Sequence, residues 1–283
     1  MKISLFKENG ALNSKPIFDA FEHSLHDKNY QVVYNDINAD IAVIWSVLWH
    51  GRMLKNKIVY EHFRKQNKNV IVLEVGGIKR GETWKVGLNG INRKNFCYSN
   101  LPNTNRNIKL NLQIHPWRQN GEFILLCGQH DKSLQWQNLP TMSTWFMKII
   151  ERIQSVSNRP IIIRPHPRCK LDSVETQYKN VYRQNPLHLK GSYDSFDLQF
   201  ERIWATVSYN SNPGPQSILA GIPAFVGHDS IAYPVANDID FLHDIETPLM
   251  PDRQQWLNEY AWTEFTLDEI YKGLPLERLT NMF

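Results

Sequence analysis

The sequence has few cysteines, and their arrangement argues against both a disulfide framework and a cysteine-ligated zinc site. Its 283 residues contain three cysteines, Cys97, Cys127 and Cys169, which are odd in number and far apart, with no CxxC pair. That pattern is typical of reduced thiols in a cytoplasm and disfavours a disulfide framework or a zinc site. We therefore expect a cytoplasmic protein that contains no metal.

Long apolar runs are missing as well. No stretch approaches the ~20 residues that a membrane span needs. The N-terminal MKISLFKENG has too short an apolar core for a secretory signal and no small-residue cleavage site. Low-complexity tracts and internal repeats are also missing. We expect a globular protein without a membrane span, and nothing in the sequence predicts an obligate protein partner.

Acidic pairs that could carry a metal-bound nucleotide diphosphate are scarce. One match to D-x-D spacing occurs at 238–240, but this stretch reads as the start of a helix and lacks a preceding strand. We therefore expect metal independence. The net charge of +4 permits an anionic partner, such as a nucleotide, a phosphate or a nucleic acid, without requiring one.

The sequence does contain two series of alternating strand and helix signals, a pattern typical of α/β layers. The first series has strands at 2–6, 30–35, 39–45 and 69–75, with helices at 17–28 and 55–68. The second has strands at 122–129, 160–167, 203–209 and 222–227, helices at 144–156 and 213–221, and two helices within 251–273. Between the two series lies a polar, Asn-rich linker. We predict two Rossmann-like lobes facing a central cleft, an N-terminal lobe at 1–115 and a C-terminal lobe with the last helices at 116–283.

A cationic cluster follows the strand that ends in IIIRPHPR (161–168). Ligands collect beyond the carboxyl ends of parallel strands, so Arg164, His166 and Arg168 are placed to bind a phosphate. Two prolines stiffen this loop. The alternative is a rigid surface turn with solvated arginines.

A second polar loop, SYNSNPGPQSILAG (208–221), runs from a strand into a short helix. Free N–H groups at a helix start attract anions, Gly214 allows close approach of a ligand, and Ser211 and Asn212 add donors. The alternative is an ordinary helix N-cap formed by Ser211 or Asn212.

This ordered pair of motifs, RPHP followed ~45 residues later by a serine-bearing helix start and AGIPAFV, resembles the donor lobe of GT-B glycosyltransferases. The likeness is to the capsule-polysaccharide, Kdo-transferase-like group and to phage-encoded glycosyltransferases. It implies that His166, Ser211 and the amides around Gly214 hold the phosphates of an activated sugar. We also expect Gln129, at the end of the strand at 122–129, in the nucleotide site.

The segment LEVGGIKRGETWKVGLNGINR (73–93) resembles the E-x-G-x-x-R segment of the same group, although Val75 and the pair Gly76-Gly77 depart from its usual pattern. We predict Glu74 as the catalytic base, with Lys79 and Arg80 as acceptor or anion contacts. Alternatively, Glu74 only accepts hydrogen bonds from the N–H groups of the glycine turn.

Two further side chains are candidate contacts of the acceptor or the sugar. Trp49, in WSVLWHGRM (45–53), could stack on an acceptor, although tryptophans more often belong to the core. Ser230 could touch the sugar or the nucleotide.

We therefore predict a glycosyltransferase that uses a UDP- or CMP-linked nucleotide sugar as co-substrate and no other cofactor. The acceptor would be a hydroxymethylated DNA base, in a host cytoplasm if a phage encodes the chain, or a glycan. A glycerophosphate or other phospho-group transferase of similar fold, and a non-catalytic nucleotide- or nucleic-acid-binding module, are the alternatives.

Overall fold

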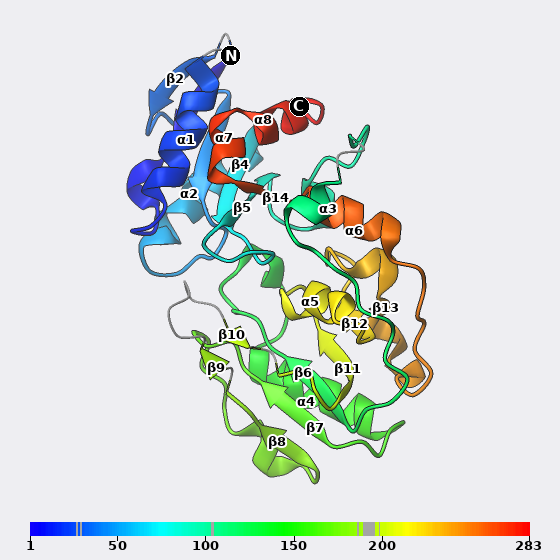
Figure 1. Ribbon diagram of the computed structural model, residues 1–283. Coiled ribbons are helices and arrows are strands. Elements are labelled where there is room, and N and C mark those ends of the chain that lie inside the picture. The colour runs from blue at the N-terminus through cyan, green and yellow to red at the C-terminus, as the bar shows by residue number, and fades with distance from the viewer. Residues whose placement is uncertain (27, 29, 103–104, 186, 189–195, 198) are drawn as a thin grey trace. The chain divides into compact units, whose positions relative to one another are not determined.

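The computed structural model describes residues 1–26, 28, 30–102, 105–185, 187–188, 196–197 and 199–283. The chain forms two compact units, shown in Figure 1. The first unit comprises Met1–Arg106, Lys132–Leu134 and Glu259–Phe283, and the second comprises Asn107–Asp131 and Gln135–Asn258. No helix in the described ranges has both the length and the apolar character that crossing a membrane requires.

The first unit is built on a six-stranded sheet in the order β14-β5-β4-β3-β1-β2. Its strands are β1 (Lys2–Leu5), β2 (Gln31–Tyr34), β3 (Ile41–Trp45), β4 (Asn69–Val75), β5 (Thr83–Leu88) and β14 (Glu264–Thr266). Strands β1, β2, β3 and β4 are parallel, and β5 lies antiparallel to both β4 and β14. Because both faces of β3 are buried, this strand is apolar at every position.

Helices cover this sheet with one apolar face each. They are α1 (Lys15–His26), α2 (Leu54–Lys65), α7 (Leu267–Tyr271) and α8 (Leu274–Thr280). In α1, Ile17, Phe18, Phe21 and Leu25 are buried, the spacing of one helical face. Figure 1 shows α7 beside α1, although the two helices lie at opposite ends of the chain.

The second unit is built on six parallel strands in the order β13-β12-β11-β6-β7-β8. They are β6 (Phe123–Cys127), β7 (Ile161–Arg164), β8 (Val181–Arg183), β11 (Ile203–Ser208), β12 (Ala224–Val226) and β13 (Asn237–Asp238). The helices are α4 (Met142–Gln154) and α5 (Pro213–Leu219), and β9 (Leu187–His188) pairs with β10 (Phe196–Asp197). Taken along the chain, the strand order is 3-2-1-4-5-6, the doubly wound order with its switch point between β6 and β11.

The chain passes from one unit to the other at four points, two of them on either side of Lys132–Leu134 and the other two within helices. These helices are α3 (Arg106–Lys109) and α6 (Gln254–Ala261).

The prediction of an α/β fold with two Rossmann-like lobes is confirmed. Six short strands were not predicted: β5, β8, β9, β10, β13 and β14. In β5, Lys85 and Gly87 interrupt the apolar pattern that would have predicted a strand, yet both residues are buried. The short β14 has only three residues and follows α6 closely.

The structure also differs from the predicted domain division, which assigned all of 116–283 to the second lobe. The last residues, Glu259–Phe283, return to the first unit. There β14 pairs with β5, and Phe265, Ile270, Leu276 and Leu279 join the core of the first sheet. The C-terminal segment packs on the first unit because burial of these apolar side chains is favourable.

Candidate functional site

The carboxyl edge of the second sheet gathers the motifs singled out in the sequence. Strand register aligns Ser208 of β11 with Cys127 of β6, and Cys127 with Arg164 of β7. The polar loops that follow these residues therefore start at one level of the same edge. Since β11 and β7 are two strand spacings apart, the His166 loop and the Ser211 loop begin about 10 Å from one another.

The loops are joined at the switch point of the sheet. Gln129, two residues beyond β6, is buried, and its Oε1 accepts a hydrogen bond from the backbone N of Asn210 at 3.0 Å. On the other side, the backbone N of Gly128 donates to the carbonyl of Arg164 at 2.9 Å. Any Cβ on Gly128 would lie 2.9 Å from the Phe146 ring, so this position needs glycine. Gln129 thus lies where nucleotide ligands bind in doubly wound folds.

The imidazole of His166 has a defined tautomer. Its Nδ1 accepts a hydrogen bond from the backbone N of Arg168 at 3.1 Å, so the neutral ring carries its proton on Nε2. The ring of His130 lies edge-on to it, with centroids 5.5 Å apart. The proline-framed loop therefore presents an N–H donor of the kind that a phosphate oxygen accepts from.

Buried hydroxyls lie across the switch point from His166. Ser208 is completely buried, and within the described ranges neither its Oγ nor that of Ser211 has a hydrogen-bond partner. A Cβ on Gly214 would lie 3.2 Å from the Ser208 Oγ. Unpaired buried hydroxyls are costly, so they mark places where a ligand or water completes the bonding.

The N-cap alternative for this loop is not observed. Asn212 occupies the N-cap position of α5, but no side chain there caps the helix. Since α5 has only seven residues, the hydroxyls and amides of the loop, and not a long helix dipole, are what the structure offers to an anion.

Of three further predicted residues of this unit, Arg164 and Ser230 are buried and Arg168 is exposed. Arg164 is 3% exposed, and its guanidinium donates to Gln184, so it is built into the sheet and does not face solvent. Arg168 is exposed. Ser230 is buried, and its Oγ accepts from the backbone N of Ala232 at 3.3 Å. Of the two arginines of the motif, Arg168 is therefore the one exposed to solvent.

The reading of 238–240 as a helix start without a strand is corrected in part. Asp238 ends the short strand β13, and its Oδ1 accepts from the backbone N of Asp240 at 2.8 Å. Asp238 thus caps the 3-10 helix that follows.

Two groups of side chains within the described ranges could hold a cation. His130, Asp131 and Cys169 place their ligand atoms within 4.8 Å of one another, as do His228, Asp238 and Asp240. A mixed nitrogen, oxygen and sulfur set suits zinc, whereas carboxylate-rich sets suit harder cations. The expected metal independence remains a prediction.

Glu74 lies at the carboxyl end of β4 in the first unit, partly exposed. Its Oε2 accepts from the Oγ of Ser46 at 2.5 Å, and its Oε1 accepts from the backbone N of Val75 at 2.9 Å. Ser46 is a non-glycine residue with φ of 64°, a strained conformation of the kind that concentrates at functional sites. The sequence analysis missed Ser46, and only its position directly after the buried strand 39–45 could have indicated it.

A different glutamate bonds the glycine turn after Glu74. The carboxylate of Glu264, which is completely buried, accepts from the backbone N of Gly77 at 2.7 Å and of Ile78 at 2.9 Å. It also accepts from the Oγ1 of Thr83 at 2.7 Å. The N–H groups of Gly77 and Ile78 are thus bonded by Glu264, whereas Glu74 accepts from the backbone N of Val75, and the catalytic role of Glu74 stays a prediction.

The other predicted contacts of the first unit are Lys79 and Arg80, which lie in the turn after β4, and Trp49, which lies in the core. Lys79 shapes the turn through its backbone: its N donates to the Oγ1 of Thr83 at 3.1 Å, and Arg80 forms a backbone bridge with Thr83. Trp49 is 7% exposed and packs in the core against Tyr60, with ring centroids 5.6 Å apart. This burial favours the core alternative for Trp49, because it leaves little ring surface for a ligand, and the stacking role stays a prediction.

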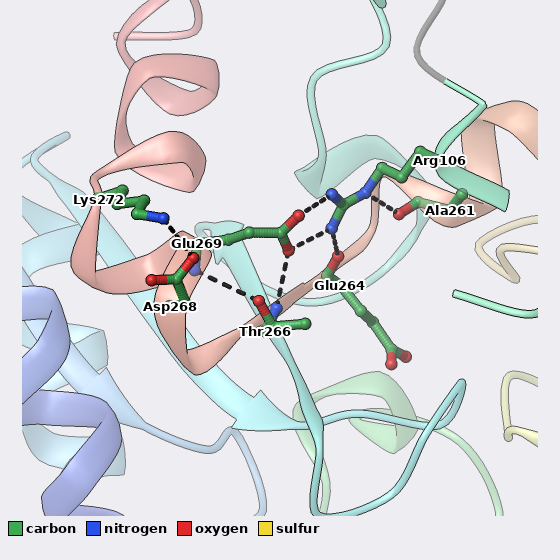
Figure 2. A network of polar contacts seen from close by, with 7 residues as sticks. All are labelled: Arg106, Ala261, Glu264, Thr266, Asp268, Glu269 and Lys272. Carbon is green, nitrogen blue, oxygen red and sulfur yellow. Dashed lines mark hydrogen bonds and ion pairs between the residues drawn. The ribbon is translucent and has the colours of Figure 1, made fainter. Parts of the chain in front are cut away.

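Figure 2 shows how Arg106 bonds the backbone of Glu264. The guanidinium of Arg106 donates to the carbonyl oxygens of Glu264 and Ala261, at 2.6 and 2.7 Å, and to both carboxylate oxygens of Glu269. The carboxylate of Glu264 points away from this network. Arg106 therefore fixes the backbone of β14 while the Glu264 side chain reaches the glycine turn.

Comparison with known proteins finds a structural likeness only. No family model and no curated protein matches the chain. The structure is similar to Thermosulfurimonas dismutans KpsC as β-Kdo 2,7 transferase, at 12% identity and a TM-score of 0.55, covering 98% of this chain and 100% of that one. For the β-Kdo 2,4 transferase of KpsC, identity is 12%, the TM-score is 0.50, and the coverage is 93% and 90%. The chain therefore has the GT-B type of fold, and the resemblance noted in the sequence is confirmed at that level.

Proposed function

We propose that this protein is a glycosyltransferase that moves a sugar from a nucleotide-sugar donor to a hydroxyl acceptor. The observation that carries the proposal is that the His166 loop and the loop with the buried serine hydroxyls start at the same carboxyl edge of a doubly wound sheet. They lie on either side of Gln129, whose side chain bonds the backbone of Asn210. The GT-B type of fold supports the same reading, since such folds bind nucleotides at this edge.

Each group would have a distinct task in the transfer. The N–H of His166, the Arg168 cation and the hydroxyls of Ser208 and Ser211 would stabilise the charge that develops on the phosphate of the leaving nucleotide, CMP or UDP. Glu74, oriented by Ser46, would take the proton of the acceptor hydroxyl. The switch-point amide of Gln129 would line the nucleotide site.

The donor we propose is linked to CMP or UDP, and the first sugar to test is Kdo, because the similar structures are named as β-Kdo transferases. A glycan is the acceptor we favour for the same reason. A hydroxymethylated DNA base stays an alternative, and the net charge of +4 permits it without adding specific support.

Calorimetry on three single variants tests the donor site. Titration of the protein with CMP, UDP and their sugars should give micromolar binding to one nucleotide. His166→Ala and Ser208→Ala should each weaken this binding at least about tenfold, since hydrogen bonds to charged groups contribute about 1.5–3 kcal/mol. His243→Ala removes an exposed imidazole of the same unit and serves as the matched control. Unchanged affinity in both site variants would refute the donor site.

The same samples separate the alternatives. Transfer or hydrolysis of a nucleotide sugar supports the transferase. Turnover of a glycerophosphate-type donor would support the phospho-group transferase. Steeply salt-dependent binding to duplex DNA, with no response to any nucleotide sugar, would support a binding module.

A further inference from the structure

Three charged side chains form a row across the sheet of the first unit. Lys85 of β5 lies directly opposite Glu74 of β4 on one side and directly opposite Glu264 of β14 on the other. Directly opposite residues of neighbouring strands point to the same face, with Cβ atoms about 4.5–5.5 Å apart. The ammonium group is thus placed between two carboxylates.

This row is buried at its centre and open at one end. Lys85 is 6% exposed and Glu264 is not exposed at all, whereas Glu74 is partly exposed. Burial lowers the pKa of Lys85, the carboxylates of Glu264 and Glu74 act in the opposite direction, and the charge of Arg80 adds to the lowering. A lysine so costly to bury persists in a sheet only where paired charges compensate it.

The inner end of the row is rigid. Glu264 makes three hydrogen bonds with the glycine turn and Thr83, and Arg106 holds its backbone. At Gly76 any Cβ would collide with the Glu264 carboxylate and with the Thr83 carbonyl, so the turn has been built around this side chain. Lys85 therefore has one fixed counter-ion, Glu264, and one that reaches the partly exposed edge, Glu74.

We propose that Lys85 is a positioning residue for Glu74: anchored by Glu264, it holds the Glu74 carboxylate in place beside Ser46. This inference rests on the proposed function, in which Glu74 takes a proton from the acceptor. The competing role for Lys85 is charge compensation of Glu264 alone, which would matter for folding and not for turnover.

Steady-state kinetics on Lys85→Met tests the positioning role. We expect kcat to fall at least about tenfold with the KM for the donor unchanged, because the loss affects the reacting base and not nucleotide binding. Lys55→Met, an exposed lysine of α2, is the matched control and should retain wild-type kcat. Since Lys85 acts through Glu74, Lys85→Met should lower kcat no further in a Glu74→Gln background.

A charge-balanced variant keeps the test decisive if Lys85→Met alone does not fold. Lys85→Met combined with Glu264→Gln removes the cation together with its buried counter-ion, and Gln still offers an oxygen to the turn. The proposal expects this double variant to fold and to remain slow. Wild-type kcat in it would show that Lys85 serves only Glu264, and would overturn the proposal.

An NMR measurement separates failure of this inference from failure of the proposed function. With 15N-labelled lysine, the Nζ signal of Lys85 should move on Glu74→Gln and stay in place on Glu61→Gln, an exposed helix position. A signal that ignores Glu74→Gln overturns the inference. If the signal responds to Glu74→Gln but the wild-type protein turns over no nucleotide sugar, only the proposed function is refuted.

Discussion

At the scale of single residues, Arg106 contacts the C-terminal segment through hydrogen bonds, an ion pair and two aromatic rings. Its guanidinium donates to two backbone carbonyls and to Glu269, and it stacks over the rings of Trp262 and Phe265 at 4.7 and 5.1 Å from their centroids. Burial alone would raise the pKa of Glu269, but the hydrogen bonds from Arg106 and Thr266 outweigh it and lower that pKa. One of the contacts that hold the C-terminal segment is thus an ion pair that needs an ionised Glu269.

Replacing this arginine should cost both stability and acid resistance. Arg106→Met should lower the free energy of unfolding by about 3 kcal/mol at neutral pH, since it leaves a partly buried carboxylate unpaired. Because the folded pKa of Glu269 is lowered, its contribution is complete above the unfolded pKa and is lost as pH falls through the folded one. Urea unfolding at neutral pH and below about pH 4 should therefore show a difference between wild type and variant that shrinks in acid.

Lys272→Met is the matched control, because it breaks an exposed ion pair with Asp268 in the same network. It should change stability by less than about 0.5 kcal/mol. An equal loss in both variants would contradict the special role of Arg106.

At the scale of elements, the hairpin of β4 and β5 is completed by a strand from far along the chain. The turn between them donates its N–H groups to Glu264, and β14 pairs along β5 from Glu264 to Thr266. A capping box between Thr266 and Glu269 then starts α7 directly. Turn, edge strand and helix start therefore form one structural element.

Gly76→Ala should break the hydrogen bonds between the glycine turn and Glu264. The new Cβ would meet the Glu264 carboxylate and the Thr83 carbonyl, neither of which can move without losing bonds, so we expect a loss of about 1–3 kcal/mol. Gly51→Ala is the control: its φ of 57° disfavours a side chain, but nothing lies within 4 Å of the added Cβ, so about 1 kcal/mol is expected. Hydrogen exchange should separate them, with Gly77 and Ile78 amides losing protection only in Gly76→Ala.

At the scale of the whole molecule, the first unit depends on both ends of the chain. Trp262, Phe265, Ile270, Leu276 and Leu279 are buried in the core formed by the N-terminal sheet. At about 2 kcal/mol for each buried side chain, they contribute on the order of 10 kcal/mol, comparable to the stability of a typical domain. The second unit contains the whole of its six-stranded sheet between Phe123 and Asp238.

Ending the chain after Asn258 should therefore unfold the first unit selectively. Limited proteolysis followed by mass spectrometry should show cleavage throughout 1–106 at protease concentrations that leave 135–258 intact. A chain that ends after Thr280 loses only three residues beyond α8 and should resist like the wild type. Equal resistance of all three chains would contradict the dependence of the first unit on its C-terminal segment.

Local patterns in the sequence were sufficient for most elements and for the loops at the strand ends. Apolar runs predicted β3, β4, β6, β7 and β11, and polar residues after those runs indicated His166, Ser211 and Glu74 as candidates, because ligands collect where parallel strands end. These signals depend on residues within a few positions of one another. Their roles in binding and chemistry remain predictions.

The pairing of distant segments was decided only by the tertiary structure. The sequence by itself determined an α/β chain with two sheets and their polar carboxyl edges, since hydrophobic periodicity is a local property. It contained no local sign that Glu264 would bond the turn at Gly77, that Lys85 would lie between two carboxylates, or that Ser46 would orient Glu74. Those contacts join residues 28 to 187 positions apart or depend on strand register, and register follows from how whole sheets pack.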